Sequence, residues 1–312
     1  AWVCAIGVFV AVAQSLALPL VALYSQELGA APRAIGIVLG VGFVLPVLAA
    51  VSIGDWVDRI GARRMVVAGA IGLAVAPVIP WIEPSLVALA AMQVVMGVAH
   101  LGSVVAAQSY VARIGGPRER NFGWYTTFVS VGQLAGPFVL GLALEATGYP
   151  GALVASAAVG VAAAGLAVGL RPLAHAGVRP ASAASGSSRK RDLASSRPLR
   201  LALVASGATL FALGVHQTFF PVYLDRQGIG AGSIGVLVGL RALAAILVRP
   251  FLGPLGRIVG DRAVLLGFTL ALCAAGLVLM PLGPSLAVFA LASVVLGAVS
   301  YTHLTLPTKR IV

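Results

Sequence analysis

A few polar side chains stand inside long apolar runs, and these residues could carry chemistry. His100 and His216 are of a type that titrates near neutral pH, so either could carry a proton. The alternative for each is a neutral ring that is hydrogen-bonded within the protein. Arg241 is the one cation deep in an apolar run, so it could face a cavity, an anionic ligand or a structural acid.

Glutamines in the same runs could add further hydrogen bonds inside the protein. The nine acidic residues all lie near the ends of apolar runs, so no run has a carboxylate in its middle that could carry a proton. Neither a nucleophile–base pair, nor a metal-ligand spacing, nor a phosphate loop stands out, which argues against an enzyme, a metal site or a bound cofactor. The candidate cavity-lining residues are Gln14, Gln93, His100, Gln133, His216, Gln217 and Arg241.

The composition calls for a lipid bilayer. Of 312 residues, 60% are hydrophobic and 10% are charged, and the mean hydropathy is +1.03. Soluble domains carry about 25% charged residues. The net charge of +12 is better explained by basic cytoplasmic loops than by nucleic-acid binding, because no basic stretch is interleaved with aromatic residues. The two cysteines are too far apart in sequence to suggest a disulfide framework.

Ten segments are long and apolar enough to cross the membrane as helices, since a crossing needs about 20 residues. They are residues 2–24, 34–53, 65–82, 86–111, 122–146, 150–170, 201–223, 233–252, 262–281 and 285–300. With the chain start in the cytoplasm, almost all loop arginines and lysines fall on the cytoplasmic side. Only Arg33 and Arg226 fall outside, which supports both the spans and the orientation.

An internal repeat divides the chain. Gly36, Gly40 and Gly97 recur as Gly235, Gly239 and Gly297, at an offset of 199 or 200 residues. We predict an N-terminal six-helix bundle over 1–170, a basic Ser/Ala-rich cytoplasmic linker over 171–200, and a second bundle over 201–300.

The second half has only four of the six helices that the repeat predicts. The tail 301–312 matches nothing in the first half, so we expect a fragment of a twelve-helix protein with an unrelated tail; a natural ten-helix protein is the alternative.

A charged motif lies between the second and third predicted helices. Residues 54–64 read Gly-Asp-Trp-Val-Asp-Arg-Ile-Gly-Ala-Arg-Arg, which resembles the signature G-x-L-a-D-r-x-G-r-k of the major facilitator superfamily. We expect two glycines to form a tight turn, and the resemblance implies a latch between helices at the cytoplasmic rim; a solvated turn is the alternative. The predicted latch comprises Gly54, Asp58, Arg59, Gly61, Arg63 and Arg113.

The fifth predicted helix carries a second signature. Its glycine spacing resembles the superfamily's antiporter motif G-x8-G-x3-G-P-x2-G-G, with Leu140 in place of one glycine. The resemblance implies a bend and a close helix contact that seal the cavity and favours export, whereas ordinary close packing would need only two glycines. The matching residues are Gly123, Gly132, Gly136, Pro137 and Gly141.

The resemblance implies an all-α polytopic membrane protein with the two-bundle fold of that superfamily. It would export drug-like or metabolite compounds by alternating access, as a monomer, from a bacterial inner membrane. Protons are a candidate coupling ion, although Gln93 stands where proton antiporters of the superfamily carry an arginine. An importer of a sugar or organic acid and a non-transporting sensor or scaffold are the alternatives.

Overall fold

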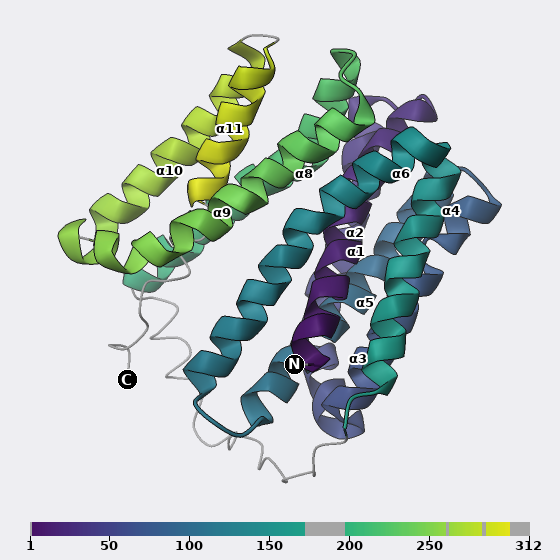
Figure 1. Cartoon of the computed structure of the whole chain (residues 1–312), viewed down its shortest axis with the longest axis vertical. Coiled ribbons are helices and arrows are strands. Elements are labelled where there is room, and N and C mark those ends of the chain that lie inside the picture. Colours follow the sequence, from purple (N-terminus) through teal and green to yellow (C-terminus); the bar gives the residue numbers. More distant parts are fainter. Residues whose placement is uncertain (1, 172–196, 260–261, 283–284, 300–312) are drawn as a thin grey trace. The chain divides into compact units, whose positions relative to one another are not determined.

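The computed structural model describes the chain except for residues 1, 172–196, 260–261, 283–284 and 300–312 (Figure 1). The predicted linker and tail therefore lie almost wholly outside the described residues. Every regular element in the described part is a helix. The elements are α1 (Trp2–Glu27), α2 (Pro32–Ile60), α3 (Ala62–Val75), α4 (Val78–Ile82), α5 (Leu86–Arg113), α6 (Arg118–Val168), α8 (Arg197–Arg226), α9 (Ala231–Val259), α10 (Arg262–Leu279), η1 (Met280–Leu282) and α11 (Leu286–Val299).

Six helical stretches among the described residues have the length and apolarity to cross a bilayer. Helices suit such apolar sequences because they satisfy every backbone hydrogen bond internally. The long stretch α6 holds two predicted spans, since Gly148 breaks it with non-helical angles (φ 68°, ψ −165°). Two shorter apolar helices lie near the C-terminal end of the described chain.

The helices extend beyond the apolar runs that predicted them. The second span was predicted to end at residue 53, yet α2 continues to Ile60. A helix continues into water until a breaker ends it, and Gly61, with φ 91° and ψ 144°, is that breaker. The third predicted span is divided at Ala76 and Pro77, because proline has no N–H to donate to the helix ladder.

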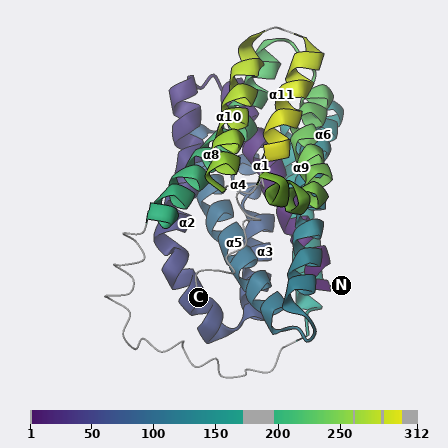
Figure 2. The same ribbon diagram turned by 90° about the vertical axis from the view of Figure 1, so that its left-hand side faces the viewer.

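The chain divides into two compact units. Unit 1 comprises Ala1–Leu173 and Gln217–Ala242, and unit 2 comprises Ala174–His216 and Leu243–Val312. Unit 1 thus holds α1–α6 with the end of α8 and the start of α9. In unit 2, α10 and α11 run side by side in both views (Figures 1 and 2).

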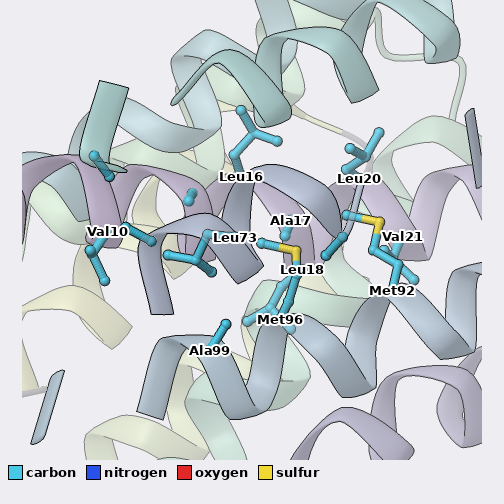
Figure 3. Packing of buried hydrophobic residues seen from close by; sticks show 14 of the residues in the cluster. Val10, Leu16, Ala17, Leu18, Leu20, Val21, Leu73, Met92, Met96 and Ala99 are labelled. Carbon is cyan, nitrogen blue, oxygen red and sulfur yellow. The ribbon is translucent and has the colours of Figure 1, made fainter. Parts of the chain in front are cut away.

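The core of unit 1 is built around α1. This helix packs along α6 and also contacts α5 and α3. Figure 3 shows Leu16, Ala17 and Leu20 of α1 among Leu73 of α3 and Met92 of α5, all essentially inaccessible. By contrast, much of α2 exposes apolar side chains such as Val47 and Val51, as expected of a helix in contact with lipid.

The internal repeat is visible in backbone hydrogen bonds at the ends of α1 and α8. Leu28 N donates to Tyr24 O and Gly29 N to Gln26 O, while Ala30 N donates to Ser25 O.

The same three bonds recur 199 residues later, from Gln227, Gly228 and Ile229. Gly29 and Gly228 both adopt positive φ, at 78° and 76°. Helices α1 and α8 therefore end in the same kind of turn at this offset, which supports the predicted repeat.

All four tryptophans of the chain lie in unit 1. Each is more than half exposed. They are Trp2, Trp56, Trp81 and Trp124.

Candidate functional site

The predicted latch lies where α2 ends and α3 begins, which we call the Asp58 end of unit 1. Arg113 Nη2, from the end of α5, is 3.5 Å from Asp58 Oδ1. Asp58 is 68% exposed and Arg113 is 27% exposed, so this ion pair is solvent-screened and contributes little to stability. Arg63 Nη2 donates to Val168 O at 2.8 Å. The motif thus links α2 to α5 and α3 to the end of α6.

Two residues of this motif differ from the expectation. Gly54 was expected to help form a tight turn, and that was wrong: Gly54 lies inside α2, and a Cβ at this position would meet nothing within 4 Å. Only Gly61 makes the turn, because the helix does not end before it. Arg59 is exposed and forms no ion pair with another described residue.

The predicted helix-5 motif, in α6, presents one pair of glycines to α1. A Cβ on Gly132 would lie 2.3 Å from Val8 O, and a Cβ on Gly136 would lie 2.0 Å from Ser15 Oγ. Ser15 donates to Ala11 O at 2.8 Å and more weakly to Gly132 O at 3.3 Å. Only hydrogen side chains permit this approach.

The other part of the motif faces α9. A Cβ on Gly141 would lie 2.8 Å from Ala231 O, and a Cβ on Gly235 would lie 2.4 Å from Pro137 O. One stretch of α6 therefore contacts helices of both sequence halves. Gly123 is different, since its position has open space around it.

The space between these helices is too small for a solute. The cavity holds about 10 Å3, no more than a single water molecule. Its lining is almost entirely apolar. The lining residues are Pro19, Leu23, Pro137, Leu140, Gly141, Leu144, Ala231, Ile234, Gly235 and Val238.

Polar contacts lie near this packed region, at the Gln26 end of unit 1, opposite the Asp58 end along α2. Gln26 Nε2 donates to Asp225 Oδ2, and Arg226 Nε donates to Gln26 Oε1 at 3.1 Å. Glu145 Oε1 accepts a hydrogen bond from Gly232 N at 2.8 Å. None of these residues was predicted from the sequence. A usable signal existed, because Gln26 and Asp225 are separated by the repeat offset of 199.

Aromatic rings lie on the same side of unit 1. Tyr24 of α1 and Tyr149 of α6 are stacked, with ring centroids 4.6 Å apart and planes inclined by 8°. This contact holds the bend at Gly148 against the end of α1.

Three of the predicted path residues lie on α1 and α5 of unit 1. Gln14 and His100 are half-buried, and Gln14 Oε1 and His100 Nδ1 have no hydrogen-bond partner among the described residues. Gln93 is 4% exposed and packs against Gly42 of α2, where an added Cβ would lie 3.1 Å from Gln93 Cβ.

The other predicted path residues are dispersed. His216 is fully buried in unit 2, where its Nε2 lies 3.0 Å from Ser293 Oγ. Gln133, Gln217 and Arg241 belong to unit 1, and only Arg241, at 4% exposed, is buried. No group of three metal-ligating side chains occurs in the described part.

Comparison with known proteins gives one family. The family model of the Major Facilitator Superfamily matches residues 3–308. No curated protein sequence matches the chain.

Among solved structures, a bacterial homologue of the human lysosomal transporter Spinster, inward-facing and unoccupied, aligns with a TM-score of 0.78 and 18% identity, over 97% of this chain and 72% of that one. The nucleoside transporter NupG aligns with a TM-score of 0.75 and 14% identity, over 97% and 79% of the two chains. At such identities the likeness shows the fold, and it agrees with the all-α membrane architecture. With its helices, its repeat and a family match over nearly its whole length, the chain belongs to the major facilitator superfamily.

Proposed function

We propose that this transporter exports drug-like or metabolite compounds by alternating access. The observation that carries the proposal is the double contact of α6. Gly132 and Gly136 pack against α1, while Pro137 and Gly141 pack against α9. A helix that packs this closely on both halves of the repeat can seal one end of a path between them.

The proposed orientation has the chain start in the cytoplasm, so the Asp58 end is cytoplasmic and the Gln26 end is external. The basic residues support it: Arg63, Arg64 and Arg113 lie at the Asp58 end, and cytoplasmic loops carry an excess of such residues. A bacterial inner membrane and a monomeric state complete the proposal.

The Asp58–Arg113 pair is proposed to act as the cytoplasmic latch. Its geometry supports a weak contact that can break in each cycle, since both side chains are partly exposed and 3.5 Å apart. The bond from Arg63 to Val168 O keeps α3 in register with the end of α6.

Protons are the proposed coupling ion, with His100 as the first candidate to carry one. His100 lies within α5, and its Nδ1 has no partner among the described residues. His216 is the second candidate, and its Nε2 lies against the Ser293 hydroxyl.

Transport assays in vesicles of both orientations test the proposal. Vesicles that contain the full chain would be prepared with a pH difference across the membrane. In separate assays they would be exposed to a lipophilic cationic dye, a nucleoside, a sugar and an organic acid. Export predicts chain-dependent accumulation of dye in inside-out vesicles. Accumulation of a sugar, organic acid or nucleoside in right-side-out vesicles instead would establish an importer, and no flux in either orientation would favour a sensor or scaffold.

Matched variants connect the flux to the α6 contact. Gly141→Leu should abolish sealing and collapse the pH difference, because its Cβ would already lie 2.8 Å from Ala231 O. Gly123→Leu is the control, since nothing lies within 4 Å of that position. Equal flux and equal leak in the two variants would contradict the proposed role of the motif.

A further inference from the structure

Gln26 and Asp225 are equivalent residues of the internal repeat, and they touch. Each occupies the same position in its turn: Gly29 N donates to Gln26 O, and Gly228 N donates to Asp225 O, 199 residues later. Their side chains are joined by the bond from Gln26 Nε2 to Asp225 Oδ2.

This contact locates the repeat axis. Two points related by a twofold rotation are separated by twice their distance from the axis, so equivalent residues can touch only where the axis passes between them. In parallel-repeat transporters the axis runs along the membrane normal, and the solute path lies between the repeats. The Gln26–Asp225 contact therefore lies across the mouth of the path.

We propose that Gln26, Asp225 and Arg226 form an external gate on the repeat axis, with Glu145 as its lateral support. The inference rests on the proposed transport function and adds the residues that close its outer end. Gln26 suits the position because one carboxamide can donate to Asp225 and accept from Arg226. Neither a carboxylate nor an ammonium group could do both.

Glu145 supports the gate from α6. Its Oε1 accepts from Gly232 N, in the first turn of α9, where an anion is favoured by the helix dipole. A Cβ on Gly232 would lie 2.5 Å from this carboxylate oxygen, so the glycine is needed for the contact.

Below the gate, the contact between α6 and α9 is made by surfaces with few side chains. Gly141 lies against Ala231, Gly235 against Pro137 O, and Gly239 against the Phe138 ring. Because few side chains interdigitate between α6 and α9, these two helices can separate without breaking an interlocked contact. The polar gate is then what holds the closed state, so breaking it should expose the apolar layer to external water.

Thiol accessibility tests the gate without depending on transport. The reporter is Leu140→Cys, at a position that is 2% exposed and lines the small cavity. Cys4→Ser and Cys273→Ser remove the native thiols of the full chain. A membrane-impermeant maleimide is added outside right-side-out vesicles, and the labelling rate of the reporter is measured.

Gln26→Ala should raise the labelling rate about tenfold, because two hydrogen bonds to charged groups of the closed state are lost. Asp225→Ala should raise it less, since Arg226 keeps its bond to Gln26. The control is Gln227→Ala, which changes an exposed glutamine in the same turn. If the rate in Gln26→Ala stays at the level of the parent, or if Gln227→Ala raises it equally, the gate is wrong.

The assay also separates this inference from the function it rests on. A raised labelling rate in a chain that moves no solute in the vesicle assay would leave the gate in place and refute transport. Normal flux with unchanged labelling would refute the gate alone. Gln26→Glu adds a variant of similar size, and it should also raise the rate because its carboxylate cannot donate to Asp225.

Discussion

Gly136→Ala should destabilise the packing of α6 on α1. The added Cβ would lie 2.0 Å from Ser15 Oγ, 2.8 Å from Val12 O and 2.9 Å from Leu16 N. The serine hydroxyl could rotate away, but the other two atoms belong to the α1 backbone. The helices must therefore separate along a contact that runs most of their length. Overpacking of this kind costs about 1–3 kcal/mol.

Gly123→Ala is the matched control from the same motif and the same helix. Nothing lies within 4 Å of the Cβ it would add, so alanine should stabilise the helix by about 0.5–1 kcal/mol. The two substitutions should therefore differ in sign, by about 1.5–4 kcal/mol in all.

Thermal unfolding of the detergent-solubilised chain, followed by tryptophan fluorescence, measures this difference. A loss of about 2 kcal/mol corresponds to a fall of about 4–8 °C in Tm. If Gly136→Ala unfolds at the same temperature as Gly123→Ala, α6 does not lie against α1 as described, and the reasoning from glycine contacts fails.

Three further substitutions, one of them with a matched control, test other parts of the structure. Asp58→Asn should change stability by less than about 0.5 kcal/mol, because its pairing with Arg113 is solvent-screened, yet it should reduce flux in the vesicle assay at unchanged expression; unchanged flux would argue for the sensor or scaffold alternative. Gly61→Ala should cost about 1–3 kcal/mol in thermal unfolding because φ is 91°, whereas Gly54→Ala, inside α2, should be neutral or slightly stabilising; equal effects would place the turn elsewhere. Ser285→Ala should cost about 1 kcal/mol by circular dichroism melting, since Ser285 Oγ accepts from Val288 N at 3.2 Å; no loss would remove this helix cap.

Much of the fold could be predicted because the bilayer imposes a length on every helix. The apolar runs located the helices, and two helix caps that were not predicted recur at the repeat offset. Ser85 Oγ accepts from Ala88 N, and Ser285 Oγ accepts from Val288 N, 200 residues later. The helix ends were less predictable, because hydropathy marks where lipid ends while a helix ends only at a breaker such as Gly61.

The candidate site was predictable only where its chemistry has a sequence pattern. Glycines at helical spacing in α6 were singled out, and all of them except Gly123 lie in close contact with α1 or α9. The contact of Gln26 with Asp225 was missed because single polar residues are ordinary at helix ends, although the repeat offset between the two residues was a usable signal. Gly54 was misassigned for the opposite reason: a glycine in a recognised motif was expected in a turn, although the helix tolerates it.

The placement of the tryptophans gives the molecule a selective optical label. All four lie in unit 1, more than half exposed, and the sequence has none in unit 2. Indole emission therefore reports on unit 1 alone, whereas far-ultraviolet circular dichroism records the helices of both units. Melting curves that coincide by the two methods would show that the units unfold together. Curves that separate would give the order in which they unfold, with no dye attached and no residue replaced.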